Sequence, residues 1–356
     1  ELQINRFRRM EKGMRKRIES EPIDVIIPWV DAADPEWDER RRQYAKELGS
    51  VQESSNSVTR FESWDNLKYV LRGIEECMPW VHRIFLVTCG QIPDFINLEC
   101  PKLRLVKHED YIPQEYLPTF NSNTIEINYH RIEELSENFI LFNDDLFPLQ
   151  PIQESYYFKN NCICDEAVER ALCPKVQELD SRVNMYRAVN IMILINKYFH
   201  KREVQRKNWW KWYYPGYGKK LRRTTALSHY YDFDYFSIPH MAVAMKKSII
   251  KKIWELEPEV MALSSRNRFR NYSDVSQYLF RFWTLCEGDF YPRRTKGLYV
   301  DITDENCMEI ADIIRNRRQQ MISLNEADEL RDFERVKQML NRALAEIYPQ
   351  KSIYEK

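Results

Sequence analysis

Asn143, Asp144 and Asp145 follow directly on the apolar run at residues 139–142, and they are the most specific local signal for chemistry in the sequence. Adjacent carboxylates repel each other unless a positive charge lies beside them. Mg²⁺ or Mn²⁺ would supply that charge and would bridge the carboxylates to diphosphate oxygens. A solvated turn is the alternative, because Asn and Asp favour turns. Since four large apolar residues indicate a buried strand before the turn, we expect Asp144 and Asp145 to be metal ligands.

Asp31 and Asp34 occupy a similar place after the apolar run at residues 23–30. Either carboxylate could bind a metal or accept a hydrogen bond from a ribose or a uracil. Pro35 suits the first position of a helix, so helix capping is an equally good interpretation of Asp34. Asp31 is less easily explained as a cap.

One histidine and a run of three alternating arginines in the last third of the chain are further candidates for chemistry. His240 has an unperturbed pKa that suits proton transfer, although a lone histidine is more often structural. Arg266, Arg268 and Arg270 alternate along the chain, which would place all three on one side of an extended segment. Guanidinium groups match phosphate oxygens bidentately. A solvated surface is the alternative for this arginine run.

These residues need a sheet to position them. Apolar runs of strand length occur at residues 23–30, 82–88, 103–106 and 139–142, and helical patterns lie between them at residues 58–78 and 123–135. This alternation predicts an α/β domain whose mostly parallel sheet is flanked by helices. Ligands bind beyond the carboxyl ends of such strands, which is where both acidic clusters fall.

The alternation of strands and helices does not continue along the whole chain. We divide the chain into a basic helix at 1–20, an α/β core at 21–160, an aromatic and basic insertion at 161–228, and a second part of the core with C-terminal helices at 229–356. Helices are expected in this last part near residues 243–256, 274–285, 307–320 and 327–348. Residues 201–223 hold nine Lys or Arg among six Trp or Tyr. This segment could stack a glycan or lie on lipid headgroups, or it could be a packed helical subdomain.

Composition excludes several classes of protein. The chain has 356 residues, 44% of them hydrophobic, with 54 Lys plus Arg against 54 Asp plus Glu, which argues against disorder and against a broad nucleic-acid surface. Only eight glycines occur, and no phosphate-binding glycine loop is present. Eight cysteines in a chain of this length suggest reduced thiols in the cytoplasm. Cys162, Cys164 and Cys173 could bind zinc or could be small buried side chains.

The order of these segments resembles the Stealth family of hexose-1-phosphate transferases, which includes bacterial capsular and exopolysaccharide phosphotransferases. Four blocks carry the resemblance. The first block is Ile23 to Pro35, with Trp29-Val30-Asp31 and Asp34-Pro35. The second runs from Arg60-Phe61 through Pro79-Trp80-Val81, Gly90-Gln91 and Asn121-Ser122 to Asp145. The third is His240 with Arg266 to Arg270, and the fourth is Ser323 to Glu326. In the last block Glu326 stands where the family usually has Asp.

The resemblance implies a Rossmann-like, nucleotide-sugar-transferase-like fold and a UDP-sugar donor. An acceptor hydroxyl would attack the phosphorus attached to the sugar and release UMP, with Mg²⁺ or Mn²⁺ on Asp144 and Asp145. It also implies that Asp145, Arg268 and His240 are catalytic, with His240 acting as a general base or as a nucleophile. The residues expected to bind the donor or acceptor are Asp31, Asp34, Arg60, Asn121, Arg266, Arg270 and Asn325.

Two other functions remain open at this stage. A metal-dependent glycosyltransferase would use the same donor but would release UDP. A non-catalytic glycan- or lipid-binding protein is suggested by Glu326 and by the Trp-rich insertion. For the phosphotransferase we expect a cytoplasmic location with peripheral contact to the inner membrane surface. We also expect a glycan acceptor that is lipid-linked, and no nucleic-acid partner.

Overall fold

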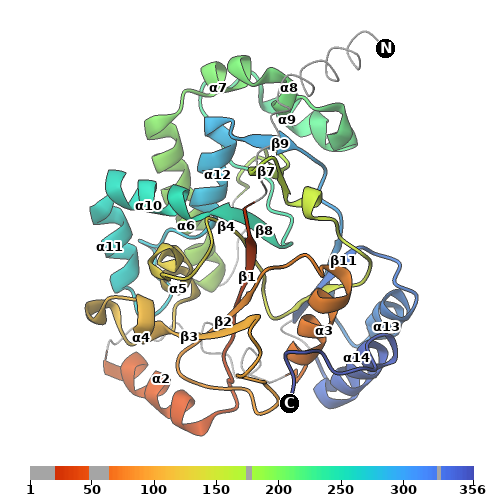
Figure 1. Cartoon of the computed structure of the whole chain (residues 1–356). Helices are drawn as coiled ribbons and strands as arrows, with labels where there is room; N and C mark the ends of the chain where they lie inside the picture. The colour runs from red at the N-terminus through yellow and green to blue at the C-terminus, as the bar shows by residue number, and fades with distance from the viewer. Residues whose placement is uncertain (1–20, 48–63, 174–178, 327–329) are drawn as a thin grey trace.

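The computed structural model describes residues 21–47, 64–173, 179–326 and 330–356. Its largest sheet has five strands in the order β3-β2-β1-β4-β8 (Figure 1). The strands are β1 (Ile23–Pro28), β2 (Ile84–Thr88), β3 (Leu103–Lys107), β4 (Asn138–Leu141) and β8 (Val243–Lys246). The first four coincide with the apolar runs, because a strand covered on both faces needs consecutive apolar residues.

The sheet is mostly parallel, as predicted. β1 pairs in parallel with β2 and β4, and β2 pairs in parallel with β3, whereas β8 is antiparallel to β4. Residues 243–246 had been expected to begin a helix, so β8 is a correction. The extended Lys246 leads directly into the helix that begins at Lys247, and no turn residue marks the change in the sequence.

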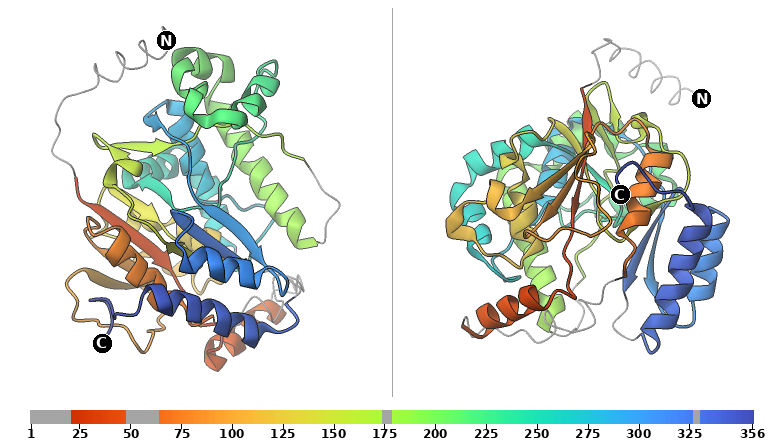
Figure 2. Two further views of the ribbon diagram at one scale, coloured as in Figure 1. Left: turned by 90° about the vertical axis from the view of Figure 1, so that its right-hand side faces the viewer. Right: turned by 60° about the horizontal axis from the view of Figure 1, so that its bottom comes forward.

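Successive residues of the sheet face two different cores. Val25, Ile27 and Leu86 pack in one core, whereas Ile26 and Phe85 pack in the other. The first core is covered by α3 (Leu67–Cys77), α13 (Cys307–Arg315) and α14 (Phe333–Ile347). The second is covered mainly by α6 (Leu179–Tyr198), α10 (Lys247–Leu256) and α12 (Tyr278–Glu287). Figure 2 shows α13 and α14 on the opposite side of the sheet from α10.

Shorter helices join these layers. Those in the first half are α2 (Pro35–Glu47), α4 (His108–Tyr111) and α5 (Ser122–Ile127), with 3₁₀ turns at Gln114–Tyr116, Tyr129–Arg131 and Glu154–Tyr156. Those that follow are α7 (Lys201–Lys207), α8 (Trp209–Trp212), a 3₁₀ segment at Pro215–Lys220, α9 (Leu221–Leu227) and α11 (Pro258–Arg266). The helical pattern predicted at 123–135 is thus divided between α5 and a 3₁₀ turn.

Two small sheets complete the fold. One has the order β10-β11-β5, with β5 at Leu146–Pro148, β10 at Leu298–Ile302 and β11 at Met321–Glu326. The other has the order β6-β7-β9, with β6 at Phe158–Lys159, β7 at Cys162–Asp165 and β9 at Phe290–Pro292. The last part of the chain, where helices were expected to dominate, thus also contributes strands β8 to β11. β8, β9 and β11 pair with segments more than 100 residues earlier in the chain, which local patterns do not reveal, whereas β10 pairs with β11.

The insertion belongs to the second core. Trp212 is fully buried and packs in the same cluster as Phe139 of β4. Lys201 is also buried, where its Nζ lies 2.7 Å from the carboxylate of Glu169. Tyr217 is buried, and its hydroxyl accepts a hydrogen bond from the backbone amide of Ala167 at 3.0 Å. These contacts support the packed-subdomain interpretation of the aromatic and basic residues.

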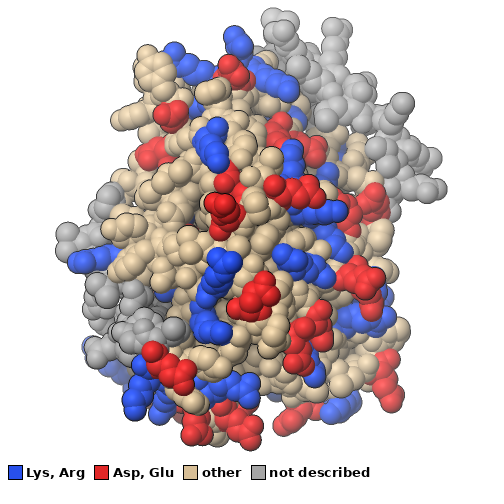
Figure 3. All heavy atoms as spheres, turned by 90° about the vertical axis from the view of Figure 1, so that its left-hand side faces the viewer, with Lys and Arg blue, Asp and Glu red and all other residues tan. Residues whose placement is uncertain are grey.

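The distribution of charge on the surface agrees with the equal numbers of acidic and basic residues in the sequence. On the face shown in Figure 3, positive and negative side chains are interspersed. Within the described ranges, we find no helix that combines the length and the apolar character needed to cross a bilayer.

Candidate active site

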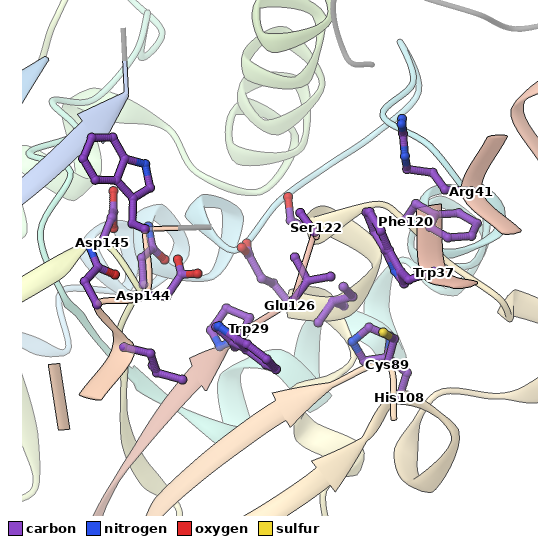
Figure 4. Close-up of a pocket in the computed structure, with 18 of the residues that line it drawn as sticks. Trp29, Trp37, Arg41, Cys89, His108, Phe120, Ser122, Glu126, Asp144 and Asp145 are labelled. Carbon is purple, nitrogen blue, oxygen red and sulfur yellow. The ribbon is translucent and has the colours of Figure 1, made fainter. Parts of the chain in front are cut away.

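A cavity of about 560 Å³ lies beyond the carboxyl ends of the central strands (Figure 4). Its walls include Trp29 after β1, Cys89 after β2, His108 after β3 and Asp144 after β4. Parallel α/β sheets bind ligands in this crevice. The structure therefore has a cavity where the strand pattern predicted one.

Asn143, Asp144 and Asp145 form the turn between β4 and β5, and all three line the cavity. Strand β11 holds this turn in place. The amide of Leu324 donates to the carbonyl of Asp145 at 2.9 Å, and the hydroxyl of Ser323 donates to Asp145 Oδ2 at 3.4 Å. Asp145 Oδ1 is buried without a hydrogen-bond partner among the described residues. One carboxylate oxygen of this pair is thus left for another ligand.

The acid pair carries more negative charge than its surroundings balance. Burial raises the pKa of Asp144 to about 6, and burial together with the charge of Asp144 raises the pKa of Asp145 to about 7. Within the described part of the chain, no cluster of three or more His, Cys, Asp or Glu side chains could hold a metal ion. Mg²⁺ commonly uses one or two carboxylates and fills its other positions with water and phosphate oxygens. The unpaired oxygen fits this mode of binding, and metal binding stays a prediction.

Glu126 is a third carboxylate in the cavity, and sequence analysis missed it. It lies on α5, and Figure 4 shows its carboxylate pointing into the cavity between Asp144 and Ser122. Burial raises the pKa of Glu126 to about 7, against the opposing effect of the positive charges of Arg187 and Arg270. A single glutamate in an amphipathic helical pattern looks like an ordinary surface residue, so no signal in the sequence marks it.

The three alternating arginines have three different positions. Arg270 lines the cavity. Arg268 donates from Nη1 to the carbonyl of Pro118 at 2.6 Å, and its guanidinium lies over the ring of Tyr44 at 5.2 Å. Arg266 is the exposed last residue of α11. The expected single arginine face is therefore wrong, because a helix ends at Arg266 and the residues after it form a loop. Of the three, Arg270 is the one whose charge acts on Glu126, and its Nη2 donates to the hydroxyl of Ser122 at 3.4 Å.

His240 does not line the cavity but lies on an exposed rim, and its ring packs on Tyr299 of β10 with centroids 4.6 Å apart. Tyr299 is paired with Ser323, the residue that donates to Asp145. Loss of water around the ring lowers the pKa of His240, and Arg187 lowers it further. His240 also has a φ of 49°, an uncommon backbone conformation that concentrates at functional sites. The rim and the acid pair are thus joined through β10 and β11.

The chain matches sequence models of two Stealth regions. Stealth protein CR1, conserved region 1, matches residues 21–49, and Stealth protein CR2, conserved region 2, matches residues 60–165. The capsular polysaccharide phosphotransferase WcwK of Streptococcus pneumoniae is 34% identical over 337 residues, covering 94% of this chain and 98% of that protein. The chain belongs to the Stealth family.

Two further relatives cover the chain to the same extent. The exopolysaccharide phosphotransferase cps2G of Lactiplantibacillus plantarum is 31% identical over 336 residues, covering 94% of this chain and 96% of that protein. The receptor polysaccharide phosphotransferase WefC of Streptococcus oralis is 30% identical over 336 residues, covering 94% and 99%. The two Stealth regions contain β1 to β5, α5 and the acid turn, so they include most of the cavity.

In the first Stealth region, Asp31 and Asp34 shape the loop between β1 and α2. Asp34 Oδ1 accepts from the amides of Glu36 and Trp37 at 3.0 and 3.4 Å, which caps α2. Gln91 Nε2 donates to Asp34 Oδ2 at 2.8 Å and to the carbonyl of Asp31 at 2.9 Å. Neither aspartate lines the cavity. Capping thus accounts for Asp34, and donor binding by Asp31 stays a prediction.

In the second Stealth region, Asn121 is fully buried and holds two elements together. Its Nδ2 donates to Asp274 Oδ2 at 2.9 Å and to the carbonyls of Asn267 and Phe269, and its Oδ1 accepts from the amide of Asn123. These bonds use its donors and leave it no access to a substrate. The prediction that Asn121 binds substrate is therefore wrong; it fixes α5, with Glu126, against the loop that carries Arg270.

The remaining predicted residues are scattered. Asn325 lies on β11, where its Nδ2 donates to Asp301 Oδ1 at 2.7 Å. Asp301 also accepts from the hydroxyl of Tyr299 at 3.1 Å, so Asn325 belongs to the rim with His240. Arg60 lies outside the described residues, as does the basic helix predicted at 1–20.

The three cysteines considered as zinc ligands do not share a site. Cys162 and Cys164 are buried on β7 beside Tyr291, whereas Cys173 is exposed. Burial raises the pKa of Cys162 to about 12 and that of Cys164 to about 11, which keeps both thiols protonated. Zinc ligands must be thiolates, so these observations favour small buried side chains.

Proposed function

We propose that this chain transfers a hexose 1-phosphate from a UDP-sugar to a hydroxyl of a glycan acceptor in capsule or exopolysaccharide synthesis. The acceptor oxygen attacks the phosphorus attached to the sugar, the bond from that phosphorus to UMP breaks, and a phosphodiester forms. The observation that carries the proposal is the convergence of Asp144, Asp145, Glu126 and Arg270 on one cavity. It occurs in a family whose relatives are named polysaccharide phosphotransferases.

The acceptor hydroxyl must lose its proton during the attack. Glu126 is placed to take it, because its side chain points into the cavity and its pKa of about 7 suits a general base at neutral pH. His240 had been proposed for this role from the family resemblance. Its lowered pKa favours the neutral imidazole, which is the form that accepts a proton or attacks phosphorus. It lies on the rim and does not line the cavity, so it is our second candidate for the base and for a phosphohistidine intermediate.

Charge on the phosphate oxygens must be balanced as the new bond forms. Arg270 supplies one fixed positive charge and a planar set of donors within the cavity. Asp144 and Asp145 would hold Mg²⁺ or Mn²⁺, which when bound supplies further positive charge to the diphosphate. Asp145 Oδ1, which is buried without a partner among the described residues, supports this assignment.

The architecture and the donor suggest where the reaction takes place. Four parallel strands with a cavity at their carboxyl ends support the nucleotide-sugar-transferase-like assignment of the fold. We propose that the chain acts in the cytoplasm on a lipid-linked glycan at the inner membrane surface.

The identity of the released nucleotide tests the proposal. The purified chain is incubated with a UDP-sugar, a divalent ion and an acceptor glycan, and nucleotides are separated by chromatography while ³¹P NMR detects the diester. We expect UMP and a phosphodiester. Release of UDP with a glycosidic product would establish the glycosyltransferase alternative and refute the proposal.

Matched substitutions separate catalysis from binding alone. Asp145→Asn and Glu126→Gln are expected to abolish transfer without unfolding the chain. The exposed Asp232→Asn and Glu259→Gln make the same chemical change elsewhere and should keep full activity. If both cavity variants supported normal polysaccharide formation in cells, the chain would be a binding protein and not the transferase.

A further inference from the structure

The insertion has an outer surface that the packing of its inner residues does not explain. On α7, Lys201, Val204 and Gln205 are buried, whereas residues 202, 203, 206 and 207 are exposed. Positions i and i+4 lie on the same side of a helix, so Arg202 and Arg206 share the outer side. We call the outer surface the basic face and define it by its exposed basic and aromatic residues, which are Arg202, Arg206, Lys207, Lys219, Arg222, Arg223, Tyr230 and Tyr231.

The basic face lies at one end of the molecule. Figure 1 shows α7, α8 and α9 together at its upper end, and in Figure 3, which has the same vertical axis, Lys and Arg side chains lie along that end. The guanidinium of Arg202 lies 4.2 Å from the ring centroid of Tyr231, and Lys201 Nζ donates to the carbonyl of Leu227 at 2.5 Å. These two contacts join α7 to the turn that follows α9, so the positive charges and the tyrosines form one surface.

The charge of the basic face is not compensated by its neighbours. Its six exposed basic side chains stand against two exposed acids in the same part of the chain, Glu203 and Asp232. Among the residues that the structure describes, none forms an ion pair with any of the six, whereas the inner cations Lys201 and Lys220 are paired with buried glutamates. Because the whole chain has as many acidic as basic residues, this excess of positive charge is local and suits a negatively charged partner.

The tyrosines and the arrangement of the charges indicate which kind of partner. Tyr230 and Tyr231 are 61% and 72% exposed, and tyrosine is enriched at membrane–water interfaces, where its ring lies among the headgroups. Clusters of about 4–8 Lys or Arg on a helical surface are typical of binding to anionic lipid headgroups. None of these residues lines the cavity, and they are spread over α7, α9 and the turn after α9, which matches a sheet of headgroups better than one chain of an anionic glycan.

The basic face is connected to the rim of the active site through the segment from Tyr231 to His240. Phe236 of this segment is buried in the second core, and Arg281 Nη1 donates to the carbonyl of Ser237 at 2.8 Å, so both ends of the segment are held by the same packed unit. Nine residues separate Tyr231 from His240, and an extended chain of that length spans at most ~30 Å. A glycan whose lipid lies in the bilayer can therefore reach the rim while the basic face stays on the membrane.

We propose that the basic face binds the chain to a membrane surface rich in anionic lipid, with its arginines and lysines at the headgroup phosphates and Tyr230 and Tyr231 at the interface. This inference rests on the proposed function, because it takes the acceptor to be lipid-linked. It adds the surface that holds the enzyme beside that acceptor. Membrane binding is separable from catalysis, since no residue of the basic face lines the cavity.

Co-sedimentation of the full chain with lipid vesicles tests the inference without any substrate. We expect binding to vesicles of phosphatidylglycerol and phosphatidylcholine in equal parts, and no binding to vesicles of phosphatidylcholine alone. A basic residue near an anionic membrane contributes about fivefold to partitioning, which is ~1 kcal/mol. The double variant Arg222→Gln, Arg223→Gln should therefore bind about 25-fold more weakly. High salt should release the wild type, because exposed charges are screened.

The double variant Arg318→Gln, Arg342→Gln is the matched control. It removes the same charge from arginines that are 58% and 79% exposed and lie with α13 and α14, away from the basic face. Surface ion pairs contribute little to stability, so this variant should fold and bind vesicles like the wild type. Tyr230→Ser with Tyr231→Ser keeps every charge of the basic face and should also weaken binding; an unchanged affinity would refute the contact of the tyrosines with the interface.

Transfer assays connect the basic face to the acceptor. Arg222→Gln with Arg223→Gln should raise the KM for a lipid-linked acceptor embedded in the anionic vesicles and leave the KM for a soluble oligosaccharide acceptor unchanged. If this variant sediments with anionic vesicles as well as the wild type does, the inference is wrong and the proposed function stands. If the wild type binds a soluble phosphodiester polysaccharide but not vesicles, the basic face binds the polymer and the inference is again wrong. If the wild type binds anionic vesicles through this face but releases no UMP with either acceptor, the membrane contact is established and the proposed function is refuted.

Discussion

Replacing Glu126 by glutamine removes a carboxylate that is costly to ionise inside the cavity, so the variant should be more stable above pH 7. The pKa of Glu126 is raised from 4.5 to about 7 by burial, with Arg187 and Arg270 opposing. Below pH 4.5 the group is protonated in the folded and the unfolded chain. As the pH rises toward 7, only the unfolded chain releases the proton, and the free energy of unfolding falls.

The rise in the pKa of Glu126 from 4.5 to about 7 corresponds to about 3 kcal/mol of free energy of unfolding, at ~1.36 kcal/mol for each pKa unit. The side chain is only half-buried, and water screens its charge. We therefore expect Glu126→Gln to raise the free energy of unfolding by about 1–2 kcal/mol at pH 8, and by less at lower pH. Urea denaturation of both proteins at about pH 5.5 and pH 8 measures this difference.

Glu257→Gln is a control with the opposite sign. Burial alone would raise the pKa of Glu257, but hydrogen bonds from Lys197 and Tyr198 outweigh it and lower the pKa. The ionised form of Glu257 therefore stabilises the fold, so its loss should destabilise the chain at pH 8. An effect of Glu126→Gln that is destabilising, or that is the same at both pH values, would refute the reasoning about this cavity.

Three other predictions follow from the site. Arg270→Ala should lower kcat/KM by about 10²–10³-fold because it removes a fixed donor from the proposed phosphate site, whereas the exposed Arg266→Ala should change it less than twofold. Asp34→Ala should lower the free energy of unfolding by about 0.5–2 kcal/mol through loss of the α2 cap. If UMP binding were lost as well, Asp34 would belong to the donor site. Asn121→Ala should cost roughly 2–4 kcal/mol because several buried hydrogen bonds are lost. A stable Asn121→Ala variant with impaired substrate binding would restore the original interpretation.

The central sheet and the edge that carries the cavity were predictable from the sequence. Consecutive apolar residues such as Val25 to Ile27 are expected to be covered on both faces, and acidic residues that follow such runs are expected at one edge of the sheet. β8 was missed because it passes into α10 without a turn. β10 and β11 were missed because their pairing joins segments that local periodicity does not connect.

The assignment of single polar residues was less successful, for a physical reason. A sequence shows that Asn121 and Arg268 can donate hydrogen bonds, but not that Asp274 and the carbonyl of Pro118 already accept them. Glu126 is the opposite case, because only the fold brings it into the cavity near Arg187 and Arg270. The Asp144-Asp145 pair was found because its repulsion is local and is visible in the sequence itself.

The pairing of β11 with β5 has a consequence for synthesis on the ribosome. The contacts that hold the Asp145 turn come from Ser323 and Leu324, almost 180 residues later in the chain. A nascent polypeptide that ends before this strand can form the parallel sheet but lacks these contacts to the turn. We expect stalled chains of that length to show no transfer activity, so that translation itself delays the onset of catalysis until β11 has emerged.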